Sequence, residues 1–201
     1  MDLINPTPEM VCFLTIARVL ARVPRFGGHT NNGVLSVAQH CLEGANAILR
    51  DTGRRDAAGA FLLHDAHEAY IGDITTPVVD AIADLSECPH HVHMAIRQLK
   101  ARLDEAIYTA AGIAWPLPAD VRDMVEEYDI RMCRTECDAR MAPSPRPWSE
   151  PYVSAEPVAD VDLWPWTEGT IESLWMGAAR DLLPCDFARH RFSVDNLPAS
   201  G

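Results

Sequence analysis

The sequence predicts a single all-α domain with a proline-rich segment near its C-terminal end. Apolar residues recur at helical spacing through most of the chain, between residues typical of helix caps. The sequence contains no convincing pair of β-strands. The chain has 201 residues, 48% of them hydrophobic and 23% charged, which suits a globular protein with one sizeable core.

Helix caps set the predicted boundaries of the helices. Thr7 followed by Pro8 is typical of a helix start, and Ser36 is a plausible N-cap for the next helix. Gly72 and Gly112 are suited to end the helices before them, because glycine adopts the left-handed C-cap conformation. We expect helices over about residues 8–22, 36–48, 56–70, 73–85, 91–111, 119–141 and 167–183.

A long segment between the last two predicted helices, residues 142–166, is rich in proline and lacks helical periodicity. It is predicted to form a strap over the surface, and loops of this length are often functional or mobile. The domain is expected to span residues 1–185, strap and last helix included. The tail that follows, residues 186–201, is predicted to be weakly ordered.

Charge and cysteine content narrow the range of functions. The net charge is −12 and the pI is about 5.0, which argues against a nucleic-acid groove but allows a small anionic substrate. No signal peptide is visible, and no apolar run approaches the roughly 20 residues that span a bilayer. The six cysteines form no CxxC pair, and Cys133 and Cys137, one helical turn apart, are interpreted as core packing. We expect reduced thiols and a cytoplasmic protein without membrane or nucleic-acid partners.

The stretch "FLLHDAHEAYIGDI", residues 61–74, places several ionisable groups on a predicted core helix. His64 lies three residues before His67 and four before Glu68, so these side chains are expected to share a face. Asp65 falls on the neighbouring apolar stripe, where a carboxylate is costly to bury unless it is paired or binds a metal.

The same pattern recurs on two other predicted helices. His40 borders the apolar face of the second helix, and Asp129 lies on the apolar side of the helix over 119–141. A mixed N/O site for a divalent metal could form from His40, His64, Asp65 and Asp129. Spacing alone does not require the three helices to meet. Helix caps, surface ion pairs and one satisfied core histidine are the alternative interpretation.

Three segments, "SVAQH", "LLHDAHEAYIGDITTP" and "EYDIRMCRTECDARM", resemble the HD-domain phosphohydrolases. The likeness covers about residues 6–141, includes the "RFGGHT" loop, and is greatest to the compact branch that acts on deoxynucleotides. That branch includes 5′-deoxynucleotidases and phage-type dATP triphosphohydrolases. The resemblance implies an HD-domain helical bundle whose catalytic metal has four protein ligands, His40, His64, Asp65 and Asp129.

The resemblance also implies roles for residues around the metal. Glu68 would orient or deprotonate the attacking water, and Arg25 would hold phosphate oxygens. Phe26 stands where the nucleotidases carry an aromatic residue beside the sugar or base. Asp73 matches the acidic group that contacts the deoxyribose 3′-hydroxyl, and His67 is expected to be a pocket residue rather than a ligand.

One position departs from the family pattern. Relatives commonly carry a phosphate-binding lysine after "TTPV", where this chain has Val79. Arg25, His29 or another cation would take that role, or additional metal ions would hold the phosphates. Glu136, seven residues beyond Asp129, is expected to brace Arg25 or another cation, or to form a buried ion pair.

The implied activity is metal-assisted hydrolysis at the α-phosphorus of a deoxynucleoside 5′-phosphate. The preferred hypothesis is conversion of dATP, or another dNTP, to deoxynucleoside and triphosphate. The alternatives are a 5′-deoxynucleotidase that acts on dNMPs and a non-catalytic HD module that senses nucleotides. The expected cofactor is Zn²⁺, Co²⁺ or Mn²⁺, with additional Mg²⁺ or Co²⁺ on the phosphates. Relatives imply a homo-oligomer, a dimer or hexamer, in the cytoplasm or, for a phage-encoded protein, the host cytoplasm.

Overall fold

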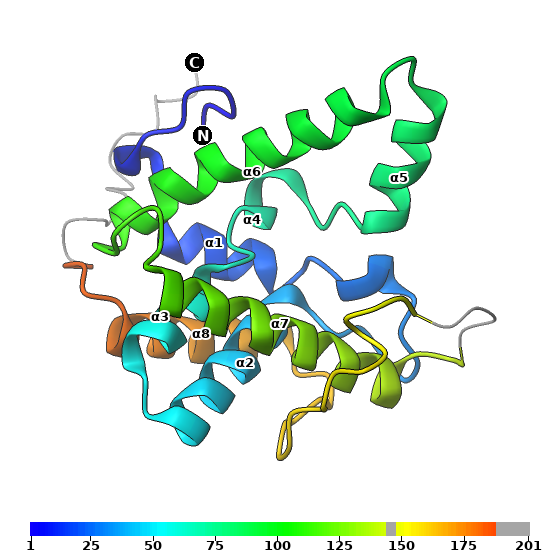
Figure 1. Ribbon diagram of the computed structural model, residues 1–201. Helices are drawn as coiled ribbons and strands as arrows, with labels where there is room; N and C mark the ends of the chain where they lie inside the picture. Colours follow the sequence, from blue (N-terminus) through cyan, green and yellow to red (C-terminus); the bar gives the residue numbers. More distant parts are fainter. Residues whose placement is uncertain (144–147, 188–201) are drawn as a thin grey trace, which may run out of the picture.

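Helices form the framework of the chain (Figure 1). The computed structural model describes residues 1–143 and 148–187, and within these ranges the chain forms eight α-helices, two short 3-10 helices and no β-strand. The predicted all-α fold is confirmed. None of the helices in this part of the chain combines the length and apolarity needed to cross a membrane.

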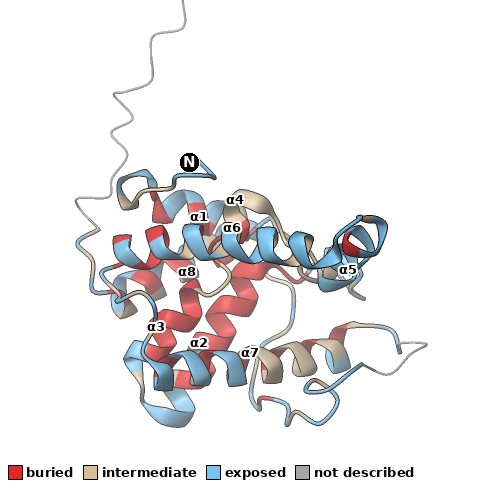
Figure 2. Cartoon of the chain, turned by 45° about the horizontal axis from the view of Figure 1, so that its top comes forward, coloured by how far each residue is buried: buried red, intermediate tan, exposed pale blue. Residues whose placement is uncertain are grey.

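The helices α2 (Val37–Thr52) and α3 (Arg55–Leu63) lie at the centre of the molecule and are largely buried (Figure 2). The hydroxyl oxygen of Ser36 accepts a hydrogen bond from the Gln39 amide at 3.2 Å, which confirms the predicted N-cap. Gly53 ends α2 with a left-handed φ of 68°, and α3 begins two residues later. The two helices are therefore held as a tight pair with other elements around them.

The remaining helices pack around this central pair. α1 (Phe13–Leu20), α7 (Ala119–Arg140) and α8 (Glu168–Leu182) each contact α2, α3 or both. α6 (Pro89–Ala110) joins α3 through Tyr108, whose hydroxyl donates to the Ala60 carbonyl at 2.8 Å. The other elements are η1 (Pro8–Met10), η2 (Arg25–Gly28), α4 (Glu68–Ile71) and α5 (Thr76–Leu85), which packs on α6.

The prediction of one continuous helix over residues 8–22 is wrong. The 3-10 helix η1 ends at Met10, the backbone is extended at Val11 and Cys12, and α1 begins only at Phe13. Val11 and Cys12 are both buried. Their burial against neighbouring elements outweighs the helical periodicity of the segment, which is a weak local preference.

The predicted third helix, about 56–70, is also interrupted. α3 ends before His64, and amides in the segment 64–68 donate to carbonyls three residues earlier at 2.9–3.2 Å. These tighter turns separate α3 from α4, and such interruptions often mark functional sites. The prediction that His64, His67 and Glu68 share the face of one continuous helix is therefore wrong.

The strap is confirmed over its described parts, residues 142–143 and 148–166, which contain no regular helix (Figure 1). The side-chain amide of Gln39 donates to two backbone carbonyls of the strap at 2.9 and 2.8 Å. On α7, the Thr135 hydroxyl oxygen accepts a bond from the Val158 amide at 2.8 Å. The strap is thus tied to the two helices that carry His40 and Asp129.

The C-terminal helix α8 is capped at its start, and the residues that follow its end pack against α1. Thr167 caps α8 by accepting a hydrogen bond from the Thr170 amide at 3.2 Å. Phe187, which falls in the predicted tail, packs its ring 5.4 Å from that of Phe13. The rest of that tail, residues 188–201, lies outside the described residues.

Close approach of α2 and α3 depends on Gly44, one turn beyond His40. A Cβ added at Gly44 would overlap the ring of Phe61, which is fully buried and cannot move aside. Gly44→Ala is therefore expected to destabilise the fold by about 1–3 kcal/mol. Gly177→Ala is the control: nothing lies within 4 Å of an added Cβ, and alanine in α8 should stabilise by about 0.5–1 kcal/mol. Urea unfolding measures both, and a Gly44→Ala variant as stable as the wild type would contradict this account.

Candidate metal centre

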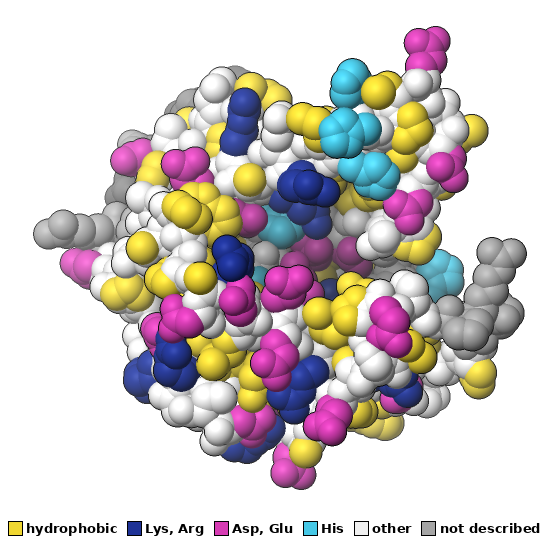
Figure 3. Space-filling model, viewed as in Figure 1, with side chains coloured by type: hydrophobic (Ala, Val, Ile, Leu, Met, Phe, Trp, Pro, Cys, Tyr) yellow, Lys and Arg dark blue, Asp and Glu magenta, His cyan; other side chains and the backbone are white. Residues whose placement is uncertain are grey.

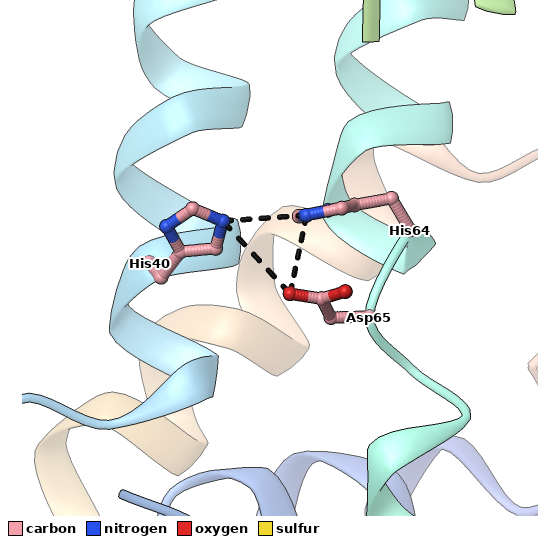
Figure 4. A group of neighbouring side chains, drawn as sticks. All are labelled: His40, His64 and Asp65. Atoms are coloured by element: carbon pink, nitrogen blue, oxygen red, sulfur yellow. Dashed lines mark hydrogen bonds and ion pairs between the residues drawn. The ribbon is translucent and has the colours of Figure 1, made fainter. Parts of the chain in front are cut away.

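Two histidine rings face each other at the centre of the molecule (Figure 4). His40 on α2 and His64, directly after α3, bring their Nε2 atoms to 3.3 Å from each other. Asp65 places Oδ2 3.2 Å from His64 Nε2 and 4.0 Å from His40 Nε2. These three side chains converge on one point and could hold a metal ion.

Asp129 reaches the same point from α7. Its Oδ1 atom lies 3.2 Å from His40 Nε2 and 3.5 Å from His64 Nε2. Ligand atoms that surround one first-row metal ion at about 2.1 Å lie about 3–3.5 Å from one another, so these distances suit a shared ion. The Asp129 side chain is 38% exposed, whereas His40 is fully buried, so the centre opens to solvent at Asp129.

Hydrogen bonds behind the histidines fix the direction of their free nitrogens. His64 Nδ1 donates to the Phe61 carbonyl oxygen at 2.7 Å, because a carbonyl can only accept. His40 Nδ1 lies 2.6 Å from Glu136 Oε1 and donates to that carboxylate. When either ring is neutral, its lone pair therefore stands on Nε2, which faces the other candidate ligands. Metal-binding histidines are typically oriented in this way.

Burial and neighbouring charges shift the pKa values of His64 and Asp65 in opposite directions. Burial lowers the pKa of His64, but Asp65 and Asp129 outweigh it and raise this pKa well above its ordinary value. Burial raises the pKa of Asp65, yet His64 and then Arg25 hold it well below its ordinary range. The carboxylates therefore stay charged beside protonated histidines. A divalent cation at this point would displace the histidine protons and supply the same positive charge.

Glu136 on α7 joins the metal centre to Arg25. Its carboxylate is fully buried, and Oε2 accepts hydrogen bonds from Arg25 Nε and Nη2 at 3.2 and 3.1 Å, while Oε1 faces His40. Arg25 Nη1 lies 3.4 Å from Asp65 Oδ2. The predicted brace between Glu136 and Arg25 is confirmed. The guanidinium is held at the edge of the centre with one nitrogen turned toward the ligands.

The loop that carries Arg25 also places two other predicted site residues. The Arg25 guanidinium lies over the Phe26 ring, 5.2 Å from its centroid, and the Phe26 backbone is left-handed with φ 55°. Trp148 of the strap meets the same ring edge-on at 6.5 Å. His29 is exposed, and its Nδ1 lies 3.1 Å from the Phe26 carbonyl oxygen. The structure therefore turns His29 back toward its own loop and does not bring it to the candidate metal ligands.

Two further carboxylates, of Glu68 and Asp73, lie close to Asp65. Burial, followed by the charges of Asp65 and Asp73, raises the pKa of Glu68 to about 9. Burial also raises the pKa of Asp73, against the opposing effect of Arg25. Figure 3 shows acidic side chains and a histidine lining a hollow beneath α6, with basic side chains at its rim.

Two charged residues of α6, Asp104 and Lys100, are absent from the sequence-based predictions. Asp104 Oδ1 lies 2.9 Å from His67 Nδ1, so His67 is bonded to α6 and not to His64. Lys100 lies near enough to Glu68 and Asp73 to oppose the rise in the pKa of both. These two residues could have been singled out from the sequence. Lys100 is its only lysine, and it stands four residues before Asp104 on one helical face.

A cavity of about 280 Å³ lies between α7 and the strap. Cys133 and Cys137 line it and are partly exposed, so the prediction that they pack in the core is wrong. These thiols face the strap, whose aromatic side chains form the other wall. The cavity is lined by Cys133, Arg134, Cys137, Asp138, Met141, Ala142, Pro143, Trp148 and Tyr152.

Comparison with known proteins places the chain in a family. No protein-family model matches the sequence. The chain is 32% identical over 142 residues to an uncharacterized protein of Rhodobacter capsulatus, an alignment that covers 69% of this chain and 67% of that protein. The two proteins belong to one family. Because this relative is uncharacterized, the likeness establishes kinship and leaves the activity to be argued from the site.

Loss of the negative charge at Glu136 is expected to weaken metal binding. Glu136→Gln keeps the side-chain shape but leaves His40 and Arg25 without their shared carboxylate. We expect the Co²⁺ affinity to fall by about 10–100-fold, the usual effect of losing such a supporting group. Glu172→Gln, which removes only a partly exposed partner of Arg18, on α8, should bind Co²⁺ like the wild type. Equal affinity for Glu136→Gln and wild type in a Co²⁺ titration would contradict the orienting role.

Proposed function

We propose that this chain is an HD-domain phosphohydrolase that hydrolyses deoxynucleoside 5′-phosphates at a metal centre. The observation that carries the proposal is the convergence of three separate segments on one point, through His40, His64, Asp65 and Asp129. Core packing alone does not account for two histidine Nε2 atoms that face each other between carboxylates. A metal ion satisfies all four ligands at once.

The ligand set suits Zn²⁺, Co²⁺ or Mn²⁺, because imidazole nitrogen favours such ions over Mg²⁺ or Ca²⁺. A divalent cation held by these residues would supply a Lewis acid that polarises a phosphoryl oxygen and lowers the pKa of bound water toward about 7. The protein's side chains contribute by orienting His40 through Glu136 and by keeping Asp65 and Asp129 ionised. Additional Mg²⁺ or Co²⁺ would accompany the phosphates of the substrate.

Glu68 is proposed to orient the attacking water and take its proton. It is buried beside Asp65, and its pKa is raised to about 9. Positive charge at the centre would lower this pKa toward neutrality, where a general base is most effective. Arg25 is proposed to hold a phosphate oxygen through the second N–H of Nη1, because Nε and Nη2 are bonded to Glu136 and the other N–H of Nη1 is directed to Asp65.

In the proposed reaction the water oxygen bonds to the α-phosphorus, the bond from phosphorus to O5′ breaks, and a proton passes to O5′. Deoxynucleoside and triphosphate leave from a dNTP, and deoxynucleoside and phosphate leave from a dNMP. We favour dATP, or another dNTP, because Lys100 adds a second cation beyond Arg25 and stands in for the lysine that is absent at Val79. Phe26 and Asp73 border the same centre and are proposed to contact the base or sugar and the 3′-hydroxyl.

The test is a panel of dNTPs, dNMPs and NTPs, incubated with the full chain and Co²⁺, Mn²⁺ or Zn²⁺, with the products separated chromatographically. Triphosphate released from dATP is the expected result. Phosphate released from dNMPs alone would replace the proposal with a 5′-deoxynucleotidase. Metal binding without turnover of any nucleotide would favour a nucleotide-sensing module.

Two variants separate metal binding from water activation in the same panel. Asp65→Asn is expected to lose metal binding and activity together. Glu68→Gln should retain the ion at His40 and His64 while kcat falls by about 100-fold or more, the usual contribution of a positioned base. Wild-type turnover in Glu68→Gln would rule out the role assigned to this carboxylate.

A further inference from the structure

We propose that Cys133, Cys137 and Met141 bind a soft monovalent metal ion, Cu⁺, in the cavity between α7 and the strap. This site is separate from the candidate centre of histidine and aspartate, and it does not depend on the proposed function. Its ligands are sulfur atoms, whereas those of the centre at His40 are nitrogen and oxygen. The two sites therefore differ in the class of metal ion that they select.

The first argument concerns the spacing of the three sulfur-containing residues. Cys133 and Cys137 lie one turn apart near the end of α7, and Met141 follows four residues later as its C-cap. The Met141 amide donates to the Cys137 carbonyl at 3.1 Å, so the helical spacing continues to this residue. Residues four apart lie on the same face of a helix. All three residues accordingly line the same cavity.

The second argument concerns the contact between the two thiols. The Cys133 thiol donates a hydrogen bond to the Cys137 sulfur, which lowers the pKa of Cys137 and raises that of Cys133. The positive charge of Arg25 favours the thiolate form of both. Sulfur ligands about 2.3 Å from one metal ion lie about 4 Å apart, so two sulfur atoms that share a hydrogen bond are close enough to bind it. Both cysteines are partly exposed, and an ion can reach them from solvent.

The third argument concerns the other polar groups of the cavity wall. Arg134 Nε donates to Asp138 Oδ2 at 2.7 Å, and Arg134 Nη1 donates to the Val153 carbonyl at 3.1 Å, so these groups are already paired. Burial raises the pKa of Tyr152, and its phenol stays neutral. No histidine is among the described residues that line the cavity. The ligands left for an ion are therefore sulfur atoms, which favour Cu⁺ over Mg²⁺ or Mn²⁺.

The aromatic side chains of the strap complete the site. Trp148 and Tyr152 line the cavity together with the thiols, and their ring centroids lie 6.0 Å apart. These rings shield one side of the cavity from water. A thiolate with fewer water molecules around it binds a soft cation more strongly, because less hydration is lost when the ion arrives.

Binding exchanges protons for the ion. The two thiols release their protons to solvent, two Cu–S bonds form, and Met141 adds its neutral thioether as a third ligand. No electron is transferred, because copper enters as Cu⁺. Since protons are released, the apparent affinity is expected to rise with pH until both thiols are ionised.

The test titrates Cu⁺ into the reduced full chain in the absence of oxygen, against the chromophoric Cu⁺ chelator bicinchoninate. We expect one tightly held ion per chain, with a copper-edge X-ray absorption spectrum that shows sulfur neighbours and no imidazole. Cys133→Ser and Cys137→Ser should each lower the affinity by more than the about 10–100-fold that is typical of losing a supporting group. Cys88→Ser, which removes an exposed thiol, is the control and should bind Cu⁺ like the wild type.

Two further variants keep the test independent of folding defects. Met141→Leu conserves the side-chain volume and both thiols, and it should weaken binding and remove one sulfur neighbour from the spectrum. Asp65→Asn, which alters only the centre at His40, should bind Cu⁺ as tightly as the wild type. Equal affinity in Cys137→Ser and the wild type, or a copper shell with imidazole nitrogen, would overturn this inference and leave the proposed function standing. Complete loss of Cu⁺ from the wild type to the chelator would overturn it as well.

Discussion

The buried carboxylate of Glu136 is the interaction on which the arrangement of the site depends. One oxygen faces His40 at 2.6 Å and the other accepts two hydrogen bonds from Arg25, so a single side chain of α7 ties together α2 and the η2 loop. A fully buried carboxylate is stable only with such partners, because an unpaired charge in the core is costly. The pairing therefore forces α7 into the position where Asp129, two turns earlier, meets the histidines.

A second constraint is the interruption of helix after α3. The tightened turns over residues 64–68 end the helix at the point where the ionisable groups begin. As a result His64 faces His40, whereas His67 faces Asp104 on α6, and Asp65 lies between them. A continuous helix would have placed His64 and His67 on one side. The break is what directs the ionisable groups of one short sequence toward two different neighbours, His40 on α2 and Asp104 on α6.

Much of this fold could be predicted from the sequence, and the predictions that are wrong have identifiable physical causes. The N-cap Ser36 and the long helices beginning at residues 89 and 119 follow from capping and periodicity. The extended backbone at Val11 arises from tertiary burial, and the turns at 64–68 arise from hydrogen bonds of 3-10 type. The spacing of apolar residues predicts neither feature. The approach of His40 to His64 could not be derived from spacing and was expected only from family resemblance. Contacts such as His67 with Asp104, 37 residues apart, require the packing of α6 to be known.

The central claim, a metal held by histidine nitrogen and aspartate oxygen, is tested most directly by X-ray absorption at the metal edge. The measurement uses the full chain loaded with one equivalent of Zn²⁺. The account predicts a nearest shell of nitrogen and oxygen at about 2.0–2.1 Å, with the outer-shell scattering of two imidazole rings. Sulfur at about 2.3 Å, which would point to Cys133 or Cys137, or a shell without imidazole, would contradict it.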